Sequence, residues 1–433
     1  MTIGVAAGAS GAPLRARLLM RLPWAFCLSV GLLLVFSQGW IPFIVGPNGD
    51  PEASGVIRLL YFPWYAVALG LTLAQARRSL SAAIHSPMIL LLIAVAFMSA
   101  LWSIDPGVTE RRAVAVMFTT LAGMAIAARY DWPEFAEVLG TAYALLAIAS
   151  FLVGLLAPGL GRMSDLFPGS WRGVFFDKNG FGDEMALAIM VFLGAAALVP
   201  RRRWLWVGFA GFAFLLILLS TSKTSLVALM VGLGAFALVA LAKRGPAMAV
   251  LMTFLGVVAF ALAACLIVFD ADALLGLLGK DATLTGRGQI WSAVLRQIHT
   301  RPWTGFGYGA VWTDQSGWGP LAWIVHDAKF RPNHSHNGWL ETWLGLGYVG
   351  LATWAALFVQ TLMLAVIGIY RNRGAYLGFP FVVVYALVSL TESVTFVYND
   401  LVWVVFAAVS VRLAMPAGTA DKRMAERLAS AAP

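Results

Sequence analysis

Long apolar stretches recur along this chain and constrain its fold more than any other feature. A helix needs about twenty apolar residues to cross the hydrocarbon core of a bilayer, where only helices and closed barrels satisfy their own backbone groups. Barrel strands are shorter and alternate apolar with polar side chains, whereas the stretches here are continuous. Only 12% of the residues are charged, against about 25% in soluble domains. The sequence therefore predicts an all-α polytopic membrane helix bundle.

Hydropathy predicts about twelve transmembrane helices in one membrane domain that covers residues 1–433. The predicted spans are 24–45, 57–76, 87–104, 113–129, 135–157, 183–199, 204–220, 224–242, 247–269, 338–370, 376–391 and 396–415. Lys and Arg collect on the cytoplasmic side of membrane proteins. With a cytoplasmic N-terminus, the inside segments carry most basic residues, among them Arg15, Arg77, Arg201, Arg371 and Lys422. We therefore expect both termini, including a tail at 416–433, to be cytoplasmic, and the net charge of +9 needs no nucleic-acid partner.

Two segments on the opposite side of the membrane are too long to be simple connectors: 158–182, and the larger 270–336. Loops longer than about fifteen residues are usually functional or disordered, and both segments are too rich in aromatic residues to favour disorder. In the larger loop, Thr285 is a predicted cap for an amphipathic helix. Its apolar face would hold Ile290, Trp291, Val294, Leu295 and Ile298, with Arg287, Gln289 and Arg296 off that face.

Arginines and lysines in the two long loops suggest an anion-binding site. Arg287 falls in the first turn of the predicted helix, where a cation opposes the helix dipole unless an anion visits. Arg172 lies among apolar residues and would pair with Asp177 or with a lipid phosphate. Lys178, Asn179 and Lys223, at the outer ends of predicted helices, would add to a basic pocket. Solvated or snorkelling side chains are the alternative for each.

His336 stands where the larger loop enters an apolar helix, and three interpretations of it are open from the residues alone. It could be a structural histidine, or a metal ligand together with His326, Asp327 and His334. The spacing of that set is not typical of a zinc site. It could also be a general base, because imidazole exchanges protons near neutral pH.

Several sequence blocks together resemble the superfamily of O-antigen ligases and Wzy-type polysaccharide polymerases. The family motif is His, then Asn, Ser or Gln, nine residues, Gly, two residues, and Gly, Thr or Tyr. Here His336-Asn337, Gly347 and Gly350 match it. Further similar blocks are VFFDKNGFG (174–182), STSKTSL (220–226), LTGRGQIW (284–291) and RPWTGFGYGAVW (301–312). The chain departs from the family at Asp177, where members commonly have His.

The resemblance implies a GT-C-like, inverting glycosyltransferase in the bacterial inner membrane that needs neither a metal nor another cofactor. Its donor would be a glycan on undecaprenyl pyrophosphate, bound on the periplasmic side among membrane lipids. It implies that Arg172 and Arg287, helped by Lys178 and Lys223, bind the pyrophosphate, and that His336 is the catalytic base. His334, Asn337, Asn179 and Asp177 are possible supporting residues.

The acceptor is either the next lipid-linked repeat unit, for a polymerase, or lipid A-core, for an O-antigen ligase. The blocks 301–312 and 336–351 look most similar to those of succinoglycan-type exopolysaccharide polymerases, which favours polymerisation. A secondary transporter is the alternative from another class. It predicts repeated halves and titratable residues at mid-membrane, which the sequence does not display.

Overall fold

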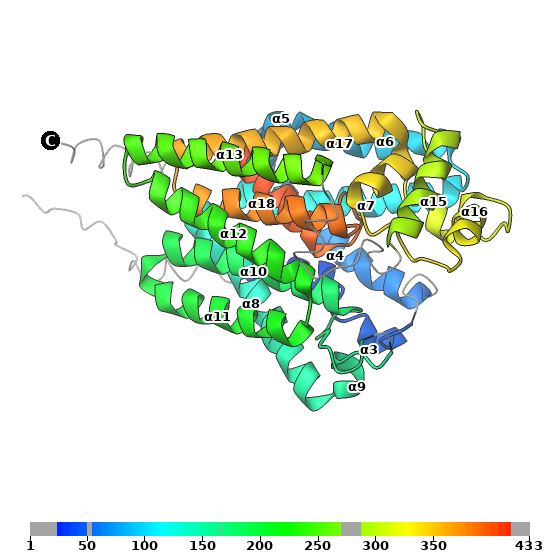
Figure 1. Cartoon of the computed structure of the whole chain (residues 1–433), viewed down its shortest axis with the longest axis horizontal. Coiled ribbons are helices and arrows are strands. Elements are labelled where there is room, and N and C mark those ends of the chain that lie inside the picture. The colour runs from blue at the N-terminus through cyan, green and yellow to red at the C-terminus, as the bar shows by residue number, and fades with distance from the viewer. Residues whose placement is uncertain (1–23, 50–53, 166, 270–286, 417–433) are drawn as a thin grey trace, which may run out of the picture.

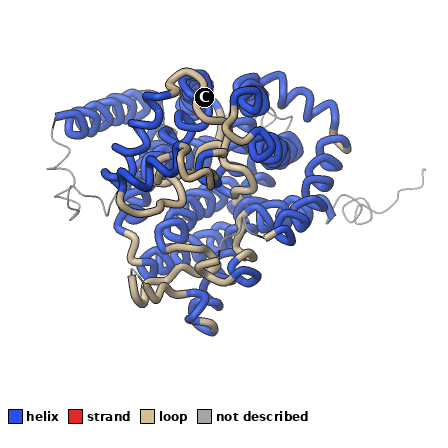
Figure 2. The backbone as a smooth tube through the Cα atoms, turned by 90° about the vertical axis from the view of Figure 1, so that its right-hand side faces the viewer, coloured by secondary structure: helices blue, strands red, loops and turns tan. Residues whose placement is uncertain are grey.

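The computed structural model describes residues 24–49, 54–165, 167–269 and 287–416. Within these residues the chain is helical and forms no strand, and Arg162 and Trp171 make an isolated bridge. Figure 2 shows the same pattern of helices and loops. Thr285, the predicted helix cap, and most of the predicted tail lie outside the described residues.

The long helices lie side by side along the long axis of the molecule, and α15 and α16 gather at its right-hand end in Figure 1. We call this the site end. The main helices are α2 (Trp24–Phe36), α4 (Gly55–Leu73), α6 (Pro87–Met98), α7 (Pro106–Arg129), α8 (Trp132–Leu156), α10 (Lys178–Leu198), α11 (Arg203–Ser220), α12 (Lys223–Ala242), α13 (Pro246–Phe269), α17 (Gly338–Arg371), α18 (Ala375–Thr391) and α19 (Leu401–Ala414). Shorter helices are α3 (Pro42–Val45), α5 (Ala76–His85), α9 (Pro158–Gly161), α15 (Arg287–Thr300) and α16 (Pro320–Ala328).

The prediction of a polytopic helical membrane protein is confirmed. In the described part, seven helices are long and apolar enough to cross a bilayer, or eight if the bent pair Ala76–His85 and Pro87–Trp102 counts as one span. The helices α2, α18 and α19 are apolar but shorter. The first predicted span, 24–45, is broken, because the helix ends at Phe36 and a turn with Gln38 at φ +60° follows. The expected total of about twelve spans therefore stays a prediction.

Helix α10 lies at the centre of the bundle and is the most buried of the seven, packed by α8, α11, α12 and α18. It is rich in small and apolar side chains. Close packing against α12 depends on Gly182, where a Cβ atom would lie 2.4 Å from the Ser225 hydroxyl. This contact brings the first turns of α10 and α12 together at the site end.

A glycine-rich turn, 305–309, fastens the large loop to the bundle. Gly305, Gly307 and Gly309 all have positive φ, which glycine adopts without strain. The turn pairs with α17, with Phe306 N donating to Leu344 O (3.0 Å). On its other side, Arg112 of α7 donates to the Gly309 carbonyl. The described part of the loop is therefore held at a fixed place on the site end.

The backbone that leads into this turn explains the first glycine of the His336 motif, Gly347. Helix α17 is interrupted at Gly347, which has φ +65° and ψ −165°. A Cβ atom there would lie 2.2 Å from the Trp303 carbonyl oxygen, so the loop crosses where only glycine fits. The motif thus spaces the histidine at the start of α17 from the kink at which the loop is fastened.

Candidate active site

His336 is held in a special backbone conformation immediately before α17. Its φ is +52°, in the left-handed region that non-glycine residues seldom adopt. The next residue, Asn337, caps the helix, with its side-chain oxygen accepting from Trp339 N (3.0 Å) and Leu340 N (3.1 Å). Asn337 therefore fixes the helix start that carries His336. This is a positioning role for a residue that the sequence marked as supporting.

Glu392, which the sequence analysis did not identify, is the centre of the candidate site. It directly follows α18 and is 9% exposed. Its Oε2 lies 2.9 Å from His336 Nδ1, and Arg287 donates to its Oε1. The signal in the sequence was a carboxyl group at the end of an apolar stretch, which usually pairs with another group.

Arg287 is buried, which corrects the prediction that it lies off the apolar face of its helix. It begins α15 and is 7% exposed, on the same face as Ile290, Val294 and Ile298. Three, seven and eleven residues separate it from these three, so one stripe of the helix carries all four. The predicted anion near this helix start is an internal one, the Glu392 carboxylate.

The electrostatics of the site fix its charges near neutral pH. Burial opposes ionisation of Glu392, but the hydrogen bond with His336 and the charge of Arg287 outweigh it, so the pKa of Glu392 is lowered. Burial, followed by the nearby His336, lowers the pKa of His334. Glu392 is thus an anion and His334 is neutral.

The contact with Glu392 also sets the tautomer of His336. A carboxylate only accepts hydrogen bonds, so Nδ1 of His336 carries a hydrogen and Nε2 presents a lone pair. The side chain of His336 is 32% exposed. A carboxylate that orients an imidazole in this way also stabilises the imidazolium formed when Nε2 takes a proton. The pair is chemically suited to general-base catalysis.

A second carboxylate, Glu341 on α17, holds the backbone that precedes His336. It accepts from Ser335 N (3.1 Å) and from the indole of Trp312. Trp291 of α15 donates to the Ser335 carbonyl (3.0 Å). The loop helix and the His334–His336 segment are therefore tied together.

Lys178 begins α10 and Lys223 begins α12. Helix α18 packs on both of these helices, and it ends at the site end, directly before Glu392. Lys178 Nζ lies 3.7 Å from the centre of the Phe167 ring and 3.5 Å from Thr221 Oγ1. Asp177 caps α10 by accepting from Asn179 N (2.8 Å), while the Asn179 side chain accepts from Ser222. Capping gives Asp177 a structural role at the start of α10.

Arg172 is 2% exposed and its guanidinium is surrounded by backbone oxygens. Its Nε donates to Leu160 O (2.8 Å), and longer bonds of 3.3 to 3.5 Å reach Asn48 and the carbonyls of Gly159, Pro47 and Phe176. Arg172 therefore organises the smaller loop, and the expected pairing with Asp177 is replaced by carbonyl contacts.

A further buried carboxyl, Asp183 on α10, lies behind the site and was also missed. One oxygen accepts from Ser225 Oγ (2.6 Å), and the other has no hydrogen-bond partner among the described residues. A carboxyl inside a membrane bundle is a functional candidate in its own right.

The four residues of the metal-ligand alternative separate in the structure. On α16, Asp327 pairs with His326 and accepts from Arg296 Nε at 2.7 Å. His334 and His336 instead lie with their ring centres 4.0 Å apart. Together with Glu392 they bring three possible ligand atoms within 4.8 Å of one another.

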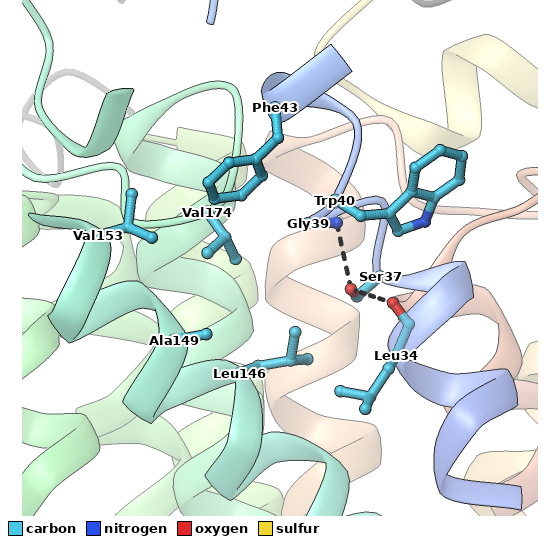
Figure 3. Close-up of a pocket in the computed structure, with 9 residues that line it drawn as sticks. All are labelled: Leu34, Ser37, Gly39, Trp40, Phe43, Leu146, Ala149, Val153 and Val174. Atoms are coloured by element: carbon cyan, nitrogen blue, oxygen red, sulfur yellow. Dashed lines mark hydrogen bonds between the residues drawn. The ribbon is translucent and has the colours of Figure 1, made fainter. Parts of the chain in front are cut away.

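An apolar cavity of about 350 Å³ opens between α2, α3 and α8 (Figure 3). Its lining residues are Leu34, Ser37, Gly39, Trp40, Phe43, Leu146, Ala149, Val153 and Val174. The Ser37 hydroxyl donates to the Leu34 carbonyl (2.6 Å), which leaves the walls apolar. Val174 stands two residues from Arg172, so the cavity adjoins the smaller loop.

Acidification should loosen the segment around His334. The pKa of His334 is lowered from the ordinary 6.5. Below pH 6.5 this side chain therefore binds a proton in the unfolded chain but not yet in the folded one. Stability present above about pH 6.5 is then lost as the pH falls toward the folded pKa. Glu392 takes up a proton only in stronger acid, because its pKa is lowered. The charges of His336, Glu341 and Asp177 also influence the pKa of His334. When the pH is lowered from 7.5 to 5.5, the backbone amides of residues 330–345 should lose protection from hydrogen exchange, after correction for the intrinsic pH dependence of the exchange rate. The His334→Gln variant should not show this loss. Equal protection at both pH values would contradict this.

Comparison with known proteins agrees with this geometry. The family described as O-Antigen ligase matches residues 207–355, which include Arg287, His336 and the Gly347 kink. The "Exopolysaccharide production protein ExoQ" of Rhizobium meliloti (strain 1021) is 32% identical over 193 residues, and the match spans 42% of this chain and 43% of that relative. With the expected motifs in these residues and an apolar helix bundle around them, this part of the chain is similar to O-antigen ligases and to that exopolysaccharide production protein.

Proposed function

We propose that this membrane protein of the polymerase and ligase family is a glycosyltransferase that polymerises exopolysaccharide or O-antigen repeat units. Its donor is a glycan on undecaprenyl pyrophosphate and its acceptor is a sugar hydroxyl of the next lipid-linked unit. The observation that carries the proposal is the series of side-chain contacts from Arg287 to Glu392 to His336. It places an anion binder and an oriented imidazole at one end of an apolar bundle.

The proposed reaction is an in-line displacement at the anomeric carbon. Nε2 of His336 takes the proton of the acceptor hydroxyl, whose oxygen bonds to that carbon. The carbon–oxygen bond to the pyrophosphate breaks, undecaprenyl pyrophosphate leaves, and the configuration inverts. The guanidinium of Arg287 binds the leaving phosphate by charge-assisted hydrogen bonds, an interaction that needs no metal ion.

Lys178 and Lys223 would add positive charge beside the leaving group from the helix starts of α10 and α12. Arg172 would reach a phosphate by exchanging its contacts of 3.3 to 3.5 Å while keeping the bond to Leu160. The apolar cavity beside the smaller loop would hold the first isoprene units of the lipid. We place the site end on the periplasmic side of the inner membrane and both termini in the cytoplasm.

A deletion strain tests the function and separates polymerase from ligase. We expect loss of long polymer, with single repeat units still attached to their normal acceptor or lipid carrier. Glycan analysis by gel and mass spectrometry checks this. Finished polymer that accumulates on undecaprenyl pyrophosphate would assign the protein as a ligase. Unchanged polymer in length and amount would contradict both activities.

A further inference from the structure

We propose that His334, His336 and Glu392 bind a divalent transition-metal ion such as Zn²⁺, and that the bound ion blocks glycan transfer. One ligand atom from each of the three residues lies within 4.8 Å of the other two. The binding stands on this geometry alone. The block rests on the proposed function, because it requires His336 to act as the base.

Two imidazoles and one carboxylate form a set that suits zinc. A tetrahedral zinc ion has bonds of about 2.0 to 2.2 Å to such ligands, so its ligand atoms lie roughly 3.3 Å apart. His336 Nδ1 and Glu392 Oε2 are already 2.9 Å apart. The positive φ of His336 brings the rings of His334 and His336 to 4.0 Å between centres, so small side-chain rotations bring the remaining ligand atoms to the distances that zinc needs. Three protein ligands leave a fourth position for water.

The donor set agrees with a soft or borderline cation and argues against a hard one. Two imidazole nitrogens and one carboxylate oxygen are ligands that zinc commonly takes in proteins. Mg²⁺ and Ca²⁺ prefer six or more oxygen ligands, and this set offers one carboxylate. Arg287 occupies the other carboxylate oxygen and its charge weakens cation binding. We therefore expect a dissociation constant on the order of micromolar rather than nanomolar.

A bound ion would disable the proposed base directly. The metal replaces the Nδ1 hydrogen of His336 and breaks its hydrogen bond with Glu392. The ring is then fixed to the ion through Nδ1. The Nδ1 proton is released to water and the neutral ring takes one up on Nε2, so no lone pair remains for the acceptor hydroxyl. The ion is an inhibitor here and takes no part in the chemistry.

Calorimetric titration of the purified full chain, stripped with EDTA and dialysed, tests the binding. ZnCl₂ should give saturable binding of about one ion per chain, and His334→Gln and His334→Ala should each weaken it at least tenfold. His326→Ala is the matched control, because His326 is a nearby histidine whose side chain is 68% exposed and which pairs with Asp327 instead. Absence of saturable binding, equal affinity in the His334 variants, loss in the control, or similar binding of MgCl₂ would each overturn the site.

The effect on activity is measured separately from the binding. Zn²⁺ at ten times its dissociation constant should reduce transfer about tenfold, and EDTA should restore the original rate. EDTA alone should leave the rate of the stripped protein unchanged. Zinc that binds at these residues without slowing transfer would overturn the block. A stripped chain that binds zinc but transfers no glycan under any condition would refute the proposed function and leave the metal site standing.

Discussion

Replacing His336 with alanine should reduce glycan transfer at least 10³-fold while the protein still inserts and folds. Nε2 of His336 is the proposed acceptor of the hydroxyl proton, and a positioned base contributes about 10² to 10⁴ in rate. Its side chain is partly exposed at the helix start, and the cap by Asn337 stays intact without the ring. Transfer from purified lipid-linked glycan, followed by gel in single-turnover conditions, measures the loss.

The control for this variant is His326→Ala, on α16 of the same loop. His326 is mostly exposed and contacts Asp327 instead of Glu392, so its removal should leave the rate within about twofold. Thermal unfolding of both variants should match the wild-type protein within a few degrees. A His336→Ala protein that makes polymer of normal length and yield would refute the role of His336 as the base.

The helical membrane class could be predicted from the sequence because hydropathy depends only on neighbouring residues. The details that failed depend on local backbone breaks. Gln38, at φ +60°, follows the end of α2 inside the first predicted span. The span predicted at 338–370 does match one helix long enough to cross a bilayer, but its kink at Gly347 was not predicted. The kink arises because the Trp303 backbone crosses there. A contact 44 residues distant in the chain leaves no trace in a hydropathy profile.

The candidate site shows the same division between local and long-range information. His336 and Arg287 were found from local motifs, and both lie in the cluster. Glu392 is 56 residues from His336 and 105 from Arg287 in sequence, so their meeting requires the packing of α15, α17 and α18. Asp183 was missed for the same reason, since its partner Ser225 on α12 is brought to it by the bundle. Arg172 was identified as a buried arginine, but its carbonyl partners are visible only in the folded loop.

Changes at Arg287 and Glu392 should separate the structural role of the pair from the binding of the donor. Either alanine substitution leaves one buried charge without its partner, which should destabilise the fold by about 3 to 5 kcal/mol. The double alanine variant should lose less stability than the sum of the single losses, because no uncompensated charge remains. Tryptophan fluorescence during thermal unfolding reports this, since the chain has 17 tryptophans.

Transfer activity should behave differently from stability in the same variants. Arg287→Lys keeps the charge beside Glu392 but loses the planar fork that binds phosphate with two parallel bonds. We expect it to unfold near the wild-type temperature while the rate at low donor concentration falls at least tenfold through a higher donor KM. The variant with both Arg287→Ala and Glu392→Ala should be as inactive as Arg287→Ala alone. Its loss of stability should nevertheless be smaller than the sum of the losses in the two single variants.

Arg296→Lys is the matched control for that substitution, because Arg296 lies on the same helix, is 55% exposed and pairs with Asp327. It should keep the wild-type donor KM and unfolding temperature. If Arg287→Lys transfers glycan at the wild-type rate and KM, the guanidinium serves only to neutralise Glu392. The pyrophosphate would then have to be bound by the cations at the starts of α10 and α12, Lys178 and Lys223. In that outcome the donor KM should instead rise when these two lysines are replaced by methionine, which keeps an unbranched side chain and removes its charge.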